Sequence, residues 1–390
     1  MECTLYLTDS CNLRCSYCYE ADKKNKSFLN ETMLKSALEF IINNNMPGDN
    51  IDLIFLGGEP LLNKKMLYKA IDIISREYAA FQSLFHYQIT TNGILLDKET
   101  AHFLMDNNFD ISISIDGDQE THNLNRTSVD GRDYYQQIIS NMKYMIDNGI
   151  DFFVRMTLTA NNVHLLFDNI KFFHAMGVQN IHLGIDYLGG WDAETLAIFD
   201  EQMNKLDAYY LHDLCNKEKG ILTIYDYKFS VFIAKREPQY CSAGSKGHLI
   251  INSKGDLYPC GYVANDSKWL IGNVKDGLDE KRCLDSIRGC VHKKSSCENC
   301  KIAFTCNGAK CGFMNYVHTG YLNQNISTTC ELEKILYHHD RKVIKKLYRN
   351  KVKRFMDYCQ IASQNNIPLS DEMKQIIADV KCEEMKKCTQ

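Results

Sequence analysis

The sequence predicts an α/β protein whose first half is built on a parallel β-sheet. Between residue 2 and about residue 185, six short β-branched or apolar runs alternate with longer amphipathic segments. Several of these runs are apolar nearly throughout, which is typical of parallel strands covered on both faces. A cysteine-dense region with little periodicity follows at residues 241–330. Together these features favour a β/α core followed by a region organised around metal sites.

The periodicity of the apolar residues, together with the residues typical of helix ends, predicts where each element of the core lies. Strands are expected at 3–8, 51–56, 84–90, 109–115, 151–158 and 180–185. Helices are expected at 31–45, 63–80, 97–107, 133–148 and 163–176, with Asn30, Asn63 and Asp97 as N-caps. Six repeats in about 185 residues favour a partial (β/α)6 barrel over the closed eightfold barrel of ~250 residues. A doubly wound sheet gives much the same pattern.

The remainder of the chain divides by pattern into three further segments. Residues 192–219 are expected to form one long helix that ends the core, and a connector with the strand-like run 227–233 follows it. The predicted boundaries are a core barrel at 1–219, a connector at 220–240, a Cys-rich domain at 241–335 and a helical tail at 336–390.

The tail carries a concentrated positive charge. Within residues 334–354 there are nine Lys or Arg residues and one acidic residue, Asp340. Such a run is typical of a solvated helix face, and it could also dock an acidic peptide.

Composition excludes several classes of protein. The 390 residues are 45% hydrophobic and 24% charged, with a net charge of −4, which is ordinary for a globular protein. This net charge gives no sign of the basic surface that binds nucleic acid. No signal peptide or membrane span is visible, so we expect a cytoplasmic protein, in which clustered cysteines bind metal or perform redox chemistry more often than they form disulfides.

The 17 cysteines are placed unevenly. Four fall in residues 1–18, none in 19–214, one at 215, nine in 241–330 and three in the tail. This distribution indicates a local demand for thiolate rather than a general role in packing.

The first cysteine motif is C-x3-C-x2-C, formed by Cys11, Cys15 and Cys18 directly after the first predicted strand. Three thiolates on one loop can hold three corners of a cubane iron–sulfur cluster and leave one iron open. Structural zinc normally takes four protein ligands, so three cysteines favour the cluster.

This motif, with the aromatic residue Tyr17, resembles the signature of the radical S-adenosylmethionine (SAM) superfamily. The turn Gly57-Gly58-Glu59-Pro60 after the second strand resembles the family's GGEP motif, whose glycines let the SAM amine approach the backbone while Glu59 fixes the turn. The resemblance implies SAM as cofactor and a 5′-deoxyadenosyl radical that abstracts hydrogen from a substrate. It assigns SAM contacts to Tyr17, Gly57, Gly58, Glu59, Asn92, Ser114 (ribose), Arg126 (carboxylate) and Tyr187 (adenine).

A second set of cysteines resembles the SPASM extension of radical SAM enzymes, with one gap of four residues in place of three, at Asn307–Lys310. The resemblance implies two auxiliary [4Fe–4S] clusters, and therefore three clusters in all. Cys297, Cys300, Cys306 and Cys330 would fill one of them, and Cys241, Cys260 and Cys311 would give three ligands to the other. That second cluster either has an open iron, which we favour, or is closed by Cys283 or Cys290. A zinc ribbon is the alternative on spacing alone.

SPASM enzymes mostly modify peptides and proteins, so the resemblance implies an oxidoreductase that matures a ribosomally made peptide through a thioether or other crosslink. The alternative is an anaerobic sulfatase-maturating enzyme that makes formylglycine. That subfamily places an Asp base directly after the second SPASM cysteine, where this chain has Gly261. Asp186 and Tyr262 are candidate proton acceptors by position alone. An alternative of another class is a metal-binding interaction protein without turnover.

The resemblance also implies an electron donor such as flavodoxin or ferredoxin. Only ten residues precede Cys11, so recognition of a leader peptide is expected in the basic tail, in the substrate pocket or on a separate leader-binding protein. No nucleic acid or membrane partner is expected.

Overall fold

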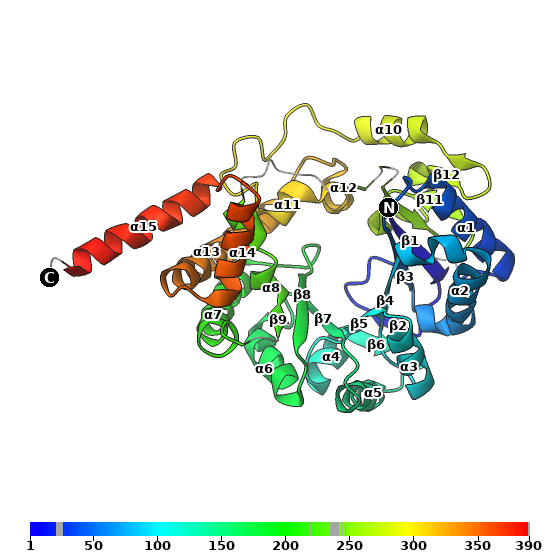
Figure 1. Cartoon of the computed structure of the whole chain (residues 1–390), viewed down its shortest axis with the longest axis horizontal. Coiled ribbons are helices and arrows are strands. Elements are labelled where there is room, and N and C mark those ends of the chain that lie inside the picture. Colours follow the sequence, from blue (N-terminus) through cyan, green and yellow to red (C-terminus); the bar gives the residue numbers. More distant parts are fainter. Residues whose placement is uncertain (21–25, 218–219, 235–241, 244, 246, 389–390) are drawn as a thin grey trace. The chain divides into compact units, whose positions relative to one another are not determined.

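The strands of the first half of the chain pair in parallel, which confirms the predicted α/β class. The computed structural model describes residues 1–20, 26–217, 220–234, 242–243, 245 and 247–388 (Figure 1). The chain forms two compact units, unit 1 at Met1–Arg155 and Ser242–Val291, and unit 2 at Met156–Cys241 and His292–Gln390. The predicted domain boundaries follow sequence motifs rather than contacts, and they stay a prediction.

Unit 1 is centred on parallel strands that follow one another along the chain. They are β1 (Glu2–Thr8), β3 (Ile51–Gly57), β4 (Phe85–Thr91), β5 (Asp110–Ser114) and the first residues of β7 (Phe153–Leu158), paired in that order. Side chains such as Leu5, Phe55 and Ile113 are fully buried on these strands. The alternation of apolar runs therefore predicted this sheet correctly.

The other edge of this sheet is built from the cysteine-dense region. β10 (His248–Ile251) lies parallel to β1, with Glu2 opposite His248. The sheet then continues as an antiparallel meander through β11 (Asp256–Tyr258), β12 (Gly272–Asn273) and β13 (Gly277–Leu278). The four strands between His248 and Leu278 thus share a sheet with the first strand of the chain.

Most helices of unit 1 lie between strands in the chain, and α1, α2 and α3 lie along one face of the sheet (Figure 1). The helices are α1 (Glu31–Asn44), α2 (Lys64–Glu77), α3 (Lys98–Asp106), α4 (Gln119–Asn125), α5 (Tyr135–Asp147) and α10 (Glu280–Arg288). Asn30 and Asp97 cap α1 and α3 as predicted. Asn63 occupies the predicted N-cap position of α2, but its side chain makes no capping hydrogen bond and its amide donates to the carbonyls of Leu7 and Leu29 instead.

Unit 2 is mostly helical. It contains the parallel pair β8 (Asn180–Ile185) and β9 (Ile221–Leu222). Its helices are α6 (Leu166–Met176), α7 (Ala193–Tyr209), α8 (Thr223–Asp226), α9 (Phe229–Ile233), α11 (Asn307–Lys310), α12 (Gly312–Thr319), α13 (Ser327–Arg349), α14 (Lys353–Gln364) and α15 (Asp371–Cys388).

Two predicted elements of unit 2 differ from the structure. The helix expected at 192–219 is α7, which ends at Tyr209 and passes into a π-helical turn at Tyr210–Leu214. The strand-like run 227–233 contains α9 instead, because Phe229, Phe232 and Ile233 are buried at the i, i+3, i+4 spacing of a helix face. Apolar contacts on a helical face here override the strand propensity of these residues.

No helix in the described part of the chain is long and apolar enough to cross a lipid bilayer.

Candidate functional site

The predicted motif residues of unit 1 gather where the parallel strands end. The cysteine loop follows β1, the Gly57-Gly58-Glu59 turn follows β3, Asn92 follows β4, and Ser114 is the last residue of β5. Because the carboxyl ends of parallel strands meet at one edge of a sheet, these segments form one site.

A short antiparallel ribbon brings Arg126 to the cysteine loop. β2 (Leu13–Cys15) pairs with β6 (Arg126–Ser128), and Cys15 lies directly opposite Arg126. The guanidinium Nη1 of Arg126 is 4.0 Å from the Cys15 Sγ. Backbone pairing therefore places a cation beside a predicted cluster thiol.

The three thiols of the loop lie close enough to one another to interact electrostatically. Burial, with a smaller contribution from the neighbouring thiols, raises the pKa of Cys11 to about 12 and that of Cys15 to about 11. The Leu13 N–H donates to the Cys11 Sγ at 3.4 Å, and the Asn92 amide lies 4.0 Å from the same sulfur. Polar hydrogens directed at sulfur stabilise the thiolate form that iron requires.

The two glycines of the turn are required by the cysteine loop itself. A Cβ on Gly57 would lie 2.1 Å from the Thr8 carbonyl oxygen, and one on Gly58 would lie 2.3 Å from that of Ser10. The N–H groups of Gly58 and Glu59 donate to these same two oxygens, both at 2.9 Å. The glycines thus let two backbone segments touch, a role that the sequence analysis did not foresee.

Glu59 joins the ends of β3 and β4. Its buried carboxylate accepts hydrogen bonds from the Thr91 hydroxyl at 2.7 Å, the Asn92 N–H at 2.7 Å and the Leu61 N–H at 3.0 Å. Burial outweighs these bonds and raises its pKa to about 7. This arrangement agrees with the predicted role of Glu59 in fixing the turn.

A buried ion pair orients the Arg126 side chain. Its Nη2 lies 3.0 Å from Asp116 Oδ1, and the Tyr17 hydroxyl donates to Asp116 Oδ2 at 2.7 Å. The guanidinium also lies over the Tyr17 ring, 5.3 Å from its centroid. Burial alone would lower the pKa of Arg126, but Asp116 more than reverses this effect and keeps the guanidinium charged.

Two buried nitrogen atoms beside this pair have no hydrogen-bond partner among the described residues. They are Arg126 Nε and His122 Nδ1. Both side chains line a hollow that also includes Leu13 and Tyr134. Burial and the charge of Arg126 lower the pKa of His122 to about 4, so this imidazole is neutral at pH 7. The buried guanidinium of Arg126 is thus the fixed cation of this hollow, whose lining also includes Arg132 and the carboxylate of Asp133.

The four cysteines predicted to hold one auxiliary cluster all lie in unit 2. Burial, followed by the charges of Cys297 and Cys300, raises the pKa of Cys330, and Cys297 also acts on Cys306. The Asn325 amide donates to the Cys297 Sγ at 3.0 Å. Hydrogen bonds from the Gly308 and Ala309 backbones favour the Cys306 thiolate. The sequence analysis missed these donors. Gly308 and Ala309 belong to the four-residue gap before Cys311, which forms α11.

The second predicted auxiliary set falls in both units. Cys241 lies outside the described residues, Cys260 belongs to unit 1 and Cys311 belongs to unit 2. Cys283 and Cys290, the predicted alternatives for a fourth ligand, are both buried in unit 1. The composition of this site stays a prediction.

Tyr187, predicted to lie near the adenine, takes part in a buried polar network of unit 2. Its hydroxyl donates to the Glu333 carboxylate and accepts from the Asn307 amide, which is 3.0 Å away. The neighbouring residue Asp186 accepts from the Leu188 N–H at 3.1 Å, and burial raises its pKa. Glu333 was missed by the sequence analysis, although it follows Cys330 by one helical turn of α13.

The second candidate proton acceptor, Tyr262, packs in unit 1 beside another tyrosine. Its ring centroid is 5.1 Å from that of Tyr19. The preceding residue is Gly261, where an added Cβ would lie 3.2 Å from the Tyr6 hydroxyl and 3.3 Å from that of Tyr19. Two tyrosines thus occupy the space beside the position at which the sulfatase-maturase pattern has a carboxylate.

The donor chemistry of both cysteine groups fits iron–sulfur clusters, which are held by thiolates. Among the described residues, no three His, Cys, Asp or Glu side chains converge as ligands of one metal ion would. The thiolates of a four-iron cluster bind separate irons and stand further apart. Thiols that receive hydrogen bonds at sulfur fit such a cluster.

Known proteins resemble this chain in sequence and in fold. A family model described as the Radical SAM superfamily matches residues 5–164. A cysteine-type anaerobic sulfatase-maturating enzyme of Clostridium perfringens (strain 13 / Type A) is 24% identical over 325 residues, covering 77% of this chain and 86% of that enzyme.

Two solved structures share the fold. The structure of native anSMEcpe with bound AdoMet and Cp18Cys peptide has a TM-score of 0.72 at 20% identity, covering 88% of this chain and 98% of that one. The structure of Streptococcus suis SuiB bound to precursor peptide SuiA has a TM-score of 0.59 at 16% identity, covering 84% of this chain and 75% of that one.

Proposed function

This protein belongs to the radical SAM superfamily through its domain at residues 5–164 and is an enzyme, and from that premise we propose that it matures a ribosomally made peptide. One observation carries the proposal: three thiols, the Gly57-Gly58-Glu59 turn and the Arg126–Asp116 pair meet at the carboxyl ends of four parallel strands. The alternative of a binding protein without turnover is wrong, because the named relatives are enzymes.

The residues of this site have different roles in binding the cluster and SAM. Cys11, Cys15 and Cys18 would hold the cluster, and the Arg126 guanidinium would bind the SAM carboxylate through a charge-assisted hydrogen bond. Asp116 and Tyr17 hold that guanidinium in place. When bound, the cluster and SAM together supply a 5′-deoxyadenosyl radical that takes a hydrogen atom from the substrate.

We assign the other SAM contacts to Asn92, which directly follows β4, and to Ser114, the last residue of the neighbouring strand β5. Tyr187 remains a proposal for the adenine, made by position. The auxiliary clusters are part of the same proposal. Cys297, Cys300, Cys306 and Cys330 would hold one, and Cys241, Cys260 and Cys311 would hold the other with an open iron.

Peptide maturation is favoured over formylglycine formation by the surroundings of Gly261. Glycine has no group that accepts a proton, and Tyr6 and Tyr19 fill the adjacent space. The Tyr6 hydroxyl donates to Glu20 Oε1 at 3.0 Å, so this tyrosine is held in place. A sulfatase-type oxidation would need another base, and the relatedness to sulfatase maturases keeps it as the second candidate.

Anaerobic reconstitution with iron and sulfide tests the enzyme class. With SAM and dithionite we expect 5′-deoxyadenosine from a protein that holds about twelve irons. Replacing Cys11, Cys15 and Cys18 by Ala should abolish SAM cleavage and remove about four irons, while the auxiliary iron stays. Iron-loaded protein that cleaves no SAM would show the assignment to be wrong.

A second experiment tests the subclass. The reconstituted enzyme is incubated with a sulfatase-derived peptide that presents Cys or Ser, and the products are analysed by mass spectrometry. We expect no formylglycine. Formylglycine formation would favour the sulfatase-maturase alternative over peptide crosslinking.

A further inference from the structure

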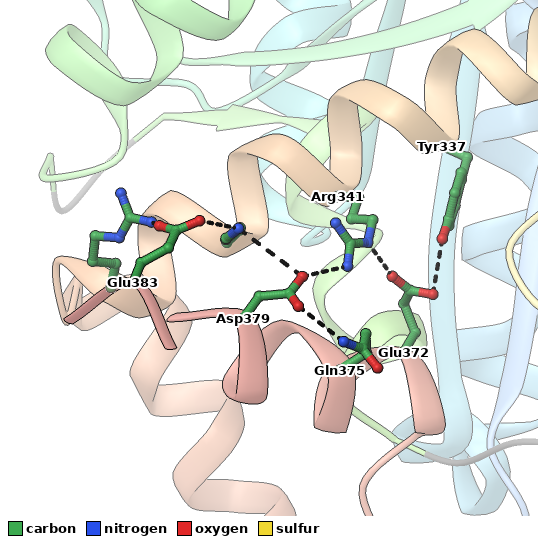
Figure 2. A network of polar contacts seen from close by, with 8 residues as sticks. Tyr337, Arg341, Glu372, Gln375, Asp379 and Glu383 are labelled. Atoms are coloured by element: carbon green, nitrogen blue, oxygen red, sulfur yellow. Dashed lines mark hydrogen bonds and ion pairs between the residues drawn. The ribbon is translucent and has the colours of Figure 1, made fainter. Parts of the chain in front are cut away.

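Helix α13 presents a row of cations along one face, shown in Figure 2. Arg341, Lys345 and Arg349 are spaced four residues apart, so their side chains lie above one another on the helix. These residues are the centre of the basic run that the sequence analysis singled out. We call them the basic face.

A second helix of unit 2, α15, occupies the basic face with carboxylates at matching heights (Figure 2). Arg341 bonds to Glu372 at 2.5 Å and to Asp379 at 2.8 Å. Lys345 bonds to Glu383 at 2.6 Å, and Arg349 pairs with the same carboxylate. The chain thus supplies its own acidic helix as the occupant of this face.

The two halves of α15 are held differently. Met373, Ile376 and Val380, all within the first ten residues of this helix, are buried. In the second half Cys382 is exposed and Met385 is 64% exposed. The ion pairs of Glu383 are partly exposed, with side-chain accessibilities of 22–42%. Exposed ion pairs are weak and are screened by salt, so the second half is the exchangeable part of the helix.

The charge of the occupant does not balance the charge of the site. A hollow at this place is lined by His338 and five Lys or Arg side chains, and Glu383 is its one carboxylate. Lys342 is also engaged by Asp207 at 2.9 Å, but Lys346 is exposed. Four carboxylates, those of Asp207, Glu372, Asp379 and Glu383, engage the other four cations, so the excess positive charge with α15 in place is that of the exposed Lys346, which attracts a further carboxylate.

We propose that the basic face binds an acidic helical segment of the peptide substrate in place of the last turns of α15. The two cations that the last turns would vacate, Lys345 and Arg349, lie four residues apart on α13, so the ligand presents carboxylates at i and i+4 along one helical face. Identification of this ligand as the substrate rests on the proposed function. Binding of an acidic helix does not.

The test uses the reconstituted full chain and a fluorescein-labelled, alanine-rich peptide whose glutamates repeat this spacing. Fluorescence anisotropy measures its binding at about 0.05 M and about 0.3 M salt. We expect binding that weakens with salt. A peptide of the same composition with its glutamates distributed around the helix should bind more weakly, and equal binding of the two peptides would overturn the proposal.

Two substitutions should change the affinity in opposite directions. Glu383→Gln frees Lys345 and Arg349 from their internal partner, so the probe should bind roughly two- to fivefold more tightly. Lys345→Gln removes a cation of the face, so the probe should bind more weakly by a similar factor. A purely structural clamp between the two helices predicts no gain from Glu383→Gln.

Matched controls separate local recognition from net charge. Glu384→Gln changes an exposed neighbour of Glu383, and Lys353→Gln changes a lysine of α14 whose side chain is 88% exposed. Both controls should leave the affinity unchanged, and equal effects from control and test variants would overturn the proposal. Polyuridylate that binds as tightly as the peptide would do the same, because it would show a general polyanion surface.

The same preparations are assayed for 5′-deoxyadenosine with SAM and dithionite. SAM cleavage without probe binding refutes this inference and leaves the proposed function intact. Probe binding without SAM cleavage supports the acidic-helix site and refutes the proposed function.

Discussion

The buried Arg126–Asp116 pair allows its role in folding to be separated from its role in binding SAM. Three variants are needed: Arg126→Met, Asp116→Leu and the double substitution. The two side chains are 6% and 0% exposed and lie 3.0 Å apart. Each single substitution therefore leaves one buried charge without its partner, and the double substitution leaves none.

The magnitudes follow from this burial. Removal of one partner from a buried pair costs about 3–5 kcal/mol, which for a unit of this size lowers Tm by about 6–20 °C. The double variant should recover most of this loss, because apolar replacement of a buried pair is often neutral. SAM affinity should fall about 10- to 150-fold in Arg126→Met and in the double variant, because a hydrogen bond between charged groups contributes about 1.5–3 kcal/mol.

Thermal unfolding followed by circular dichroism measures stability, and equilibrium dialysis of labelled SAM measures affinity. Arg76→Met is the matched control, because this arginine is 79% exposed and pairs only at the surface of α2 with Asp72. It should change stability by less than about 0.5 kcal/mol. A double variant that binds SAM like the unaltered protein would refute the assignment of Arg126. A stable Arg126→Met variant would refute the reasoning from the buried charge.

Three further predictions concern other parts of the molecule. Gly58→Ala should disrupt the cysteine loop and lower its iron content, because the new Cβ would lie 2.3 Å from the Ser10 carbonyl oxygen; Gly190→Ala, with open space around it, is the control. Asn325→Leu removes the 3.0 Å donor to Cys297 and should lower the reduction potential of that auxiliary cluster in electrochemical titration, because the bond favours the more negative state. The third concerns His339. Burial alone would lower the pKa of this histidine, but Asp207 and Asp200 raise it above its usual value. The histidine should therefore stabilise the fold fully below about pH 6.5, and this contribution should be lost as pH rises through the raised pKa. The free energy of unfolding in urea should differ more between the unaltered protein and His339→Gln at pH 6 than at pH 9. Lys342 and Tyr225 also contact Asp207 in this cluster, and both are the same in the two proteins.

Parts of the site could be predicted because the residues that form them are close together in the sequence. The C-x3-C-x2-C loop and the Gly57-Gly58-Glu59 turn are short motifs, and the end of a strand places each of them. Asp116 follows Ser114 by two residues, but its partnership with Arg126 depends on the pairing of β2 with β6. Asn325 and Glu333 carry no sequence signal of their own, since their importance comes from the groups that they contact.

The basic tail shows how a correct charge count can give an incomplete prediction. The nine cations of residues 334–354 are real, but part of their counter-charge lies on α15, about 30 to 40 residues further on. A count over a sequence window misses it, because helix packing rather than chain proximity brings these charges together.

The sequence alone determined the α/β class, the positions of the parallel strands along the chain and the loops that carry the cluster motifs. These properties depend on local periodicity and on short motifs, which a single chain segment carries in full. Only the tertiary structure decided that β10 pairs with β1, that the two glycines serve contact between backbone segments, and that α15 covers the basic face. The physical reason is that each of these features is a contact between segments distant in the chain, and its geometry is fixed by packing and hydrogen bonding in three dimensions.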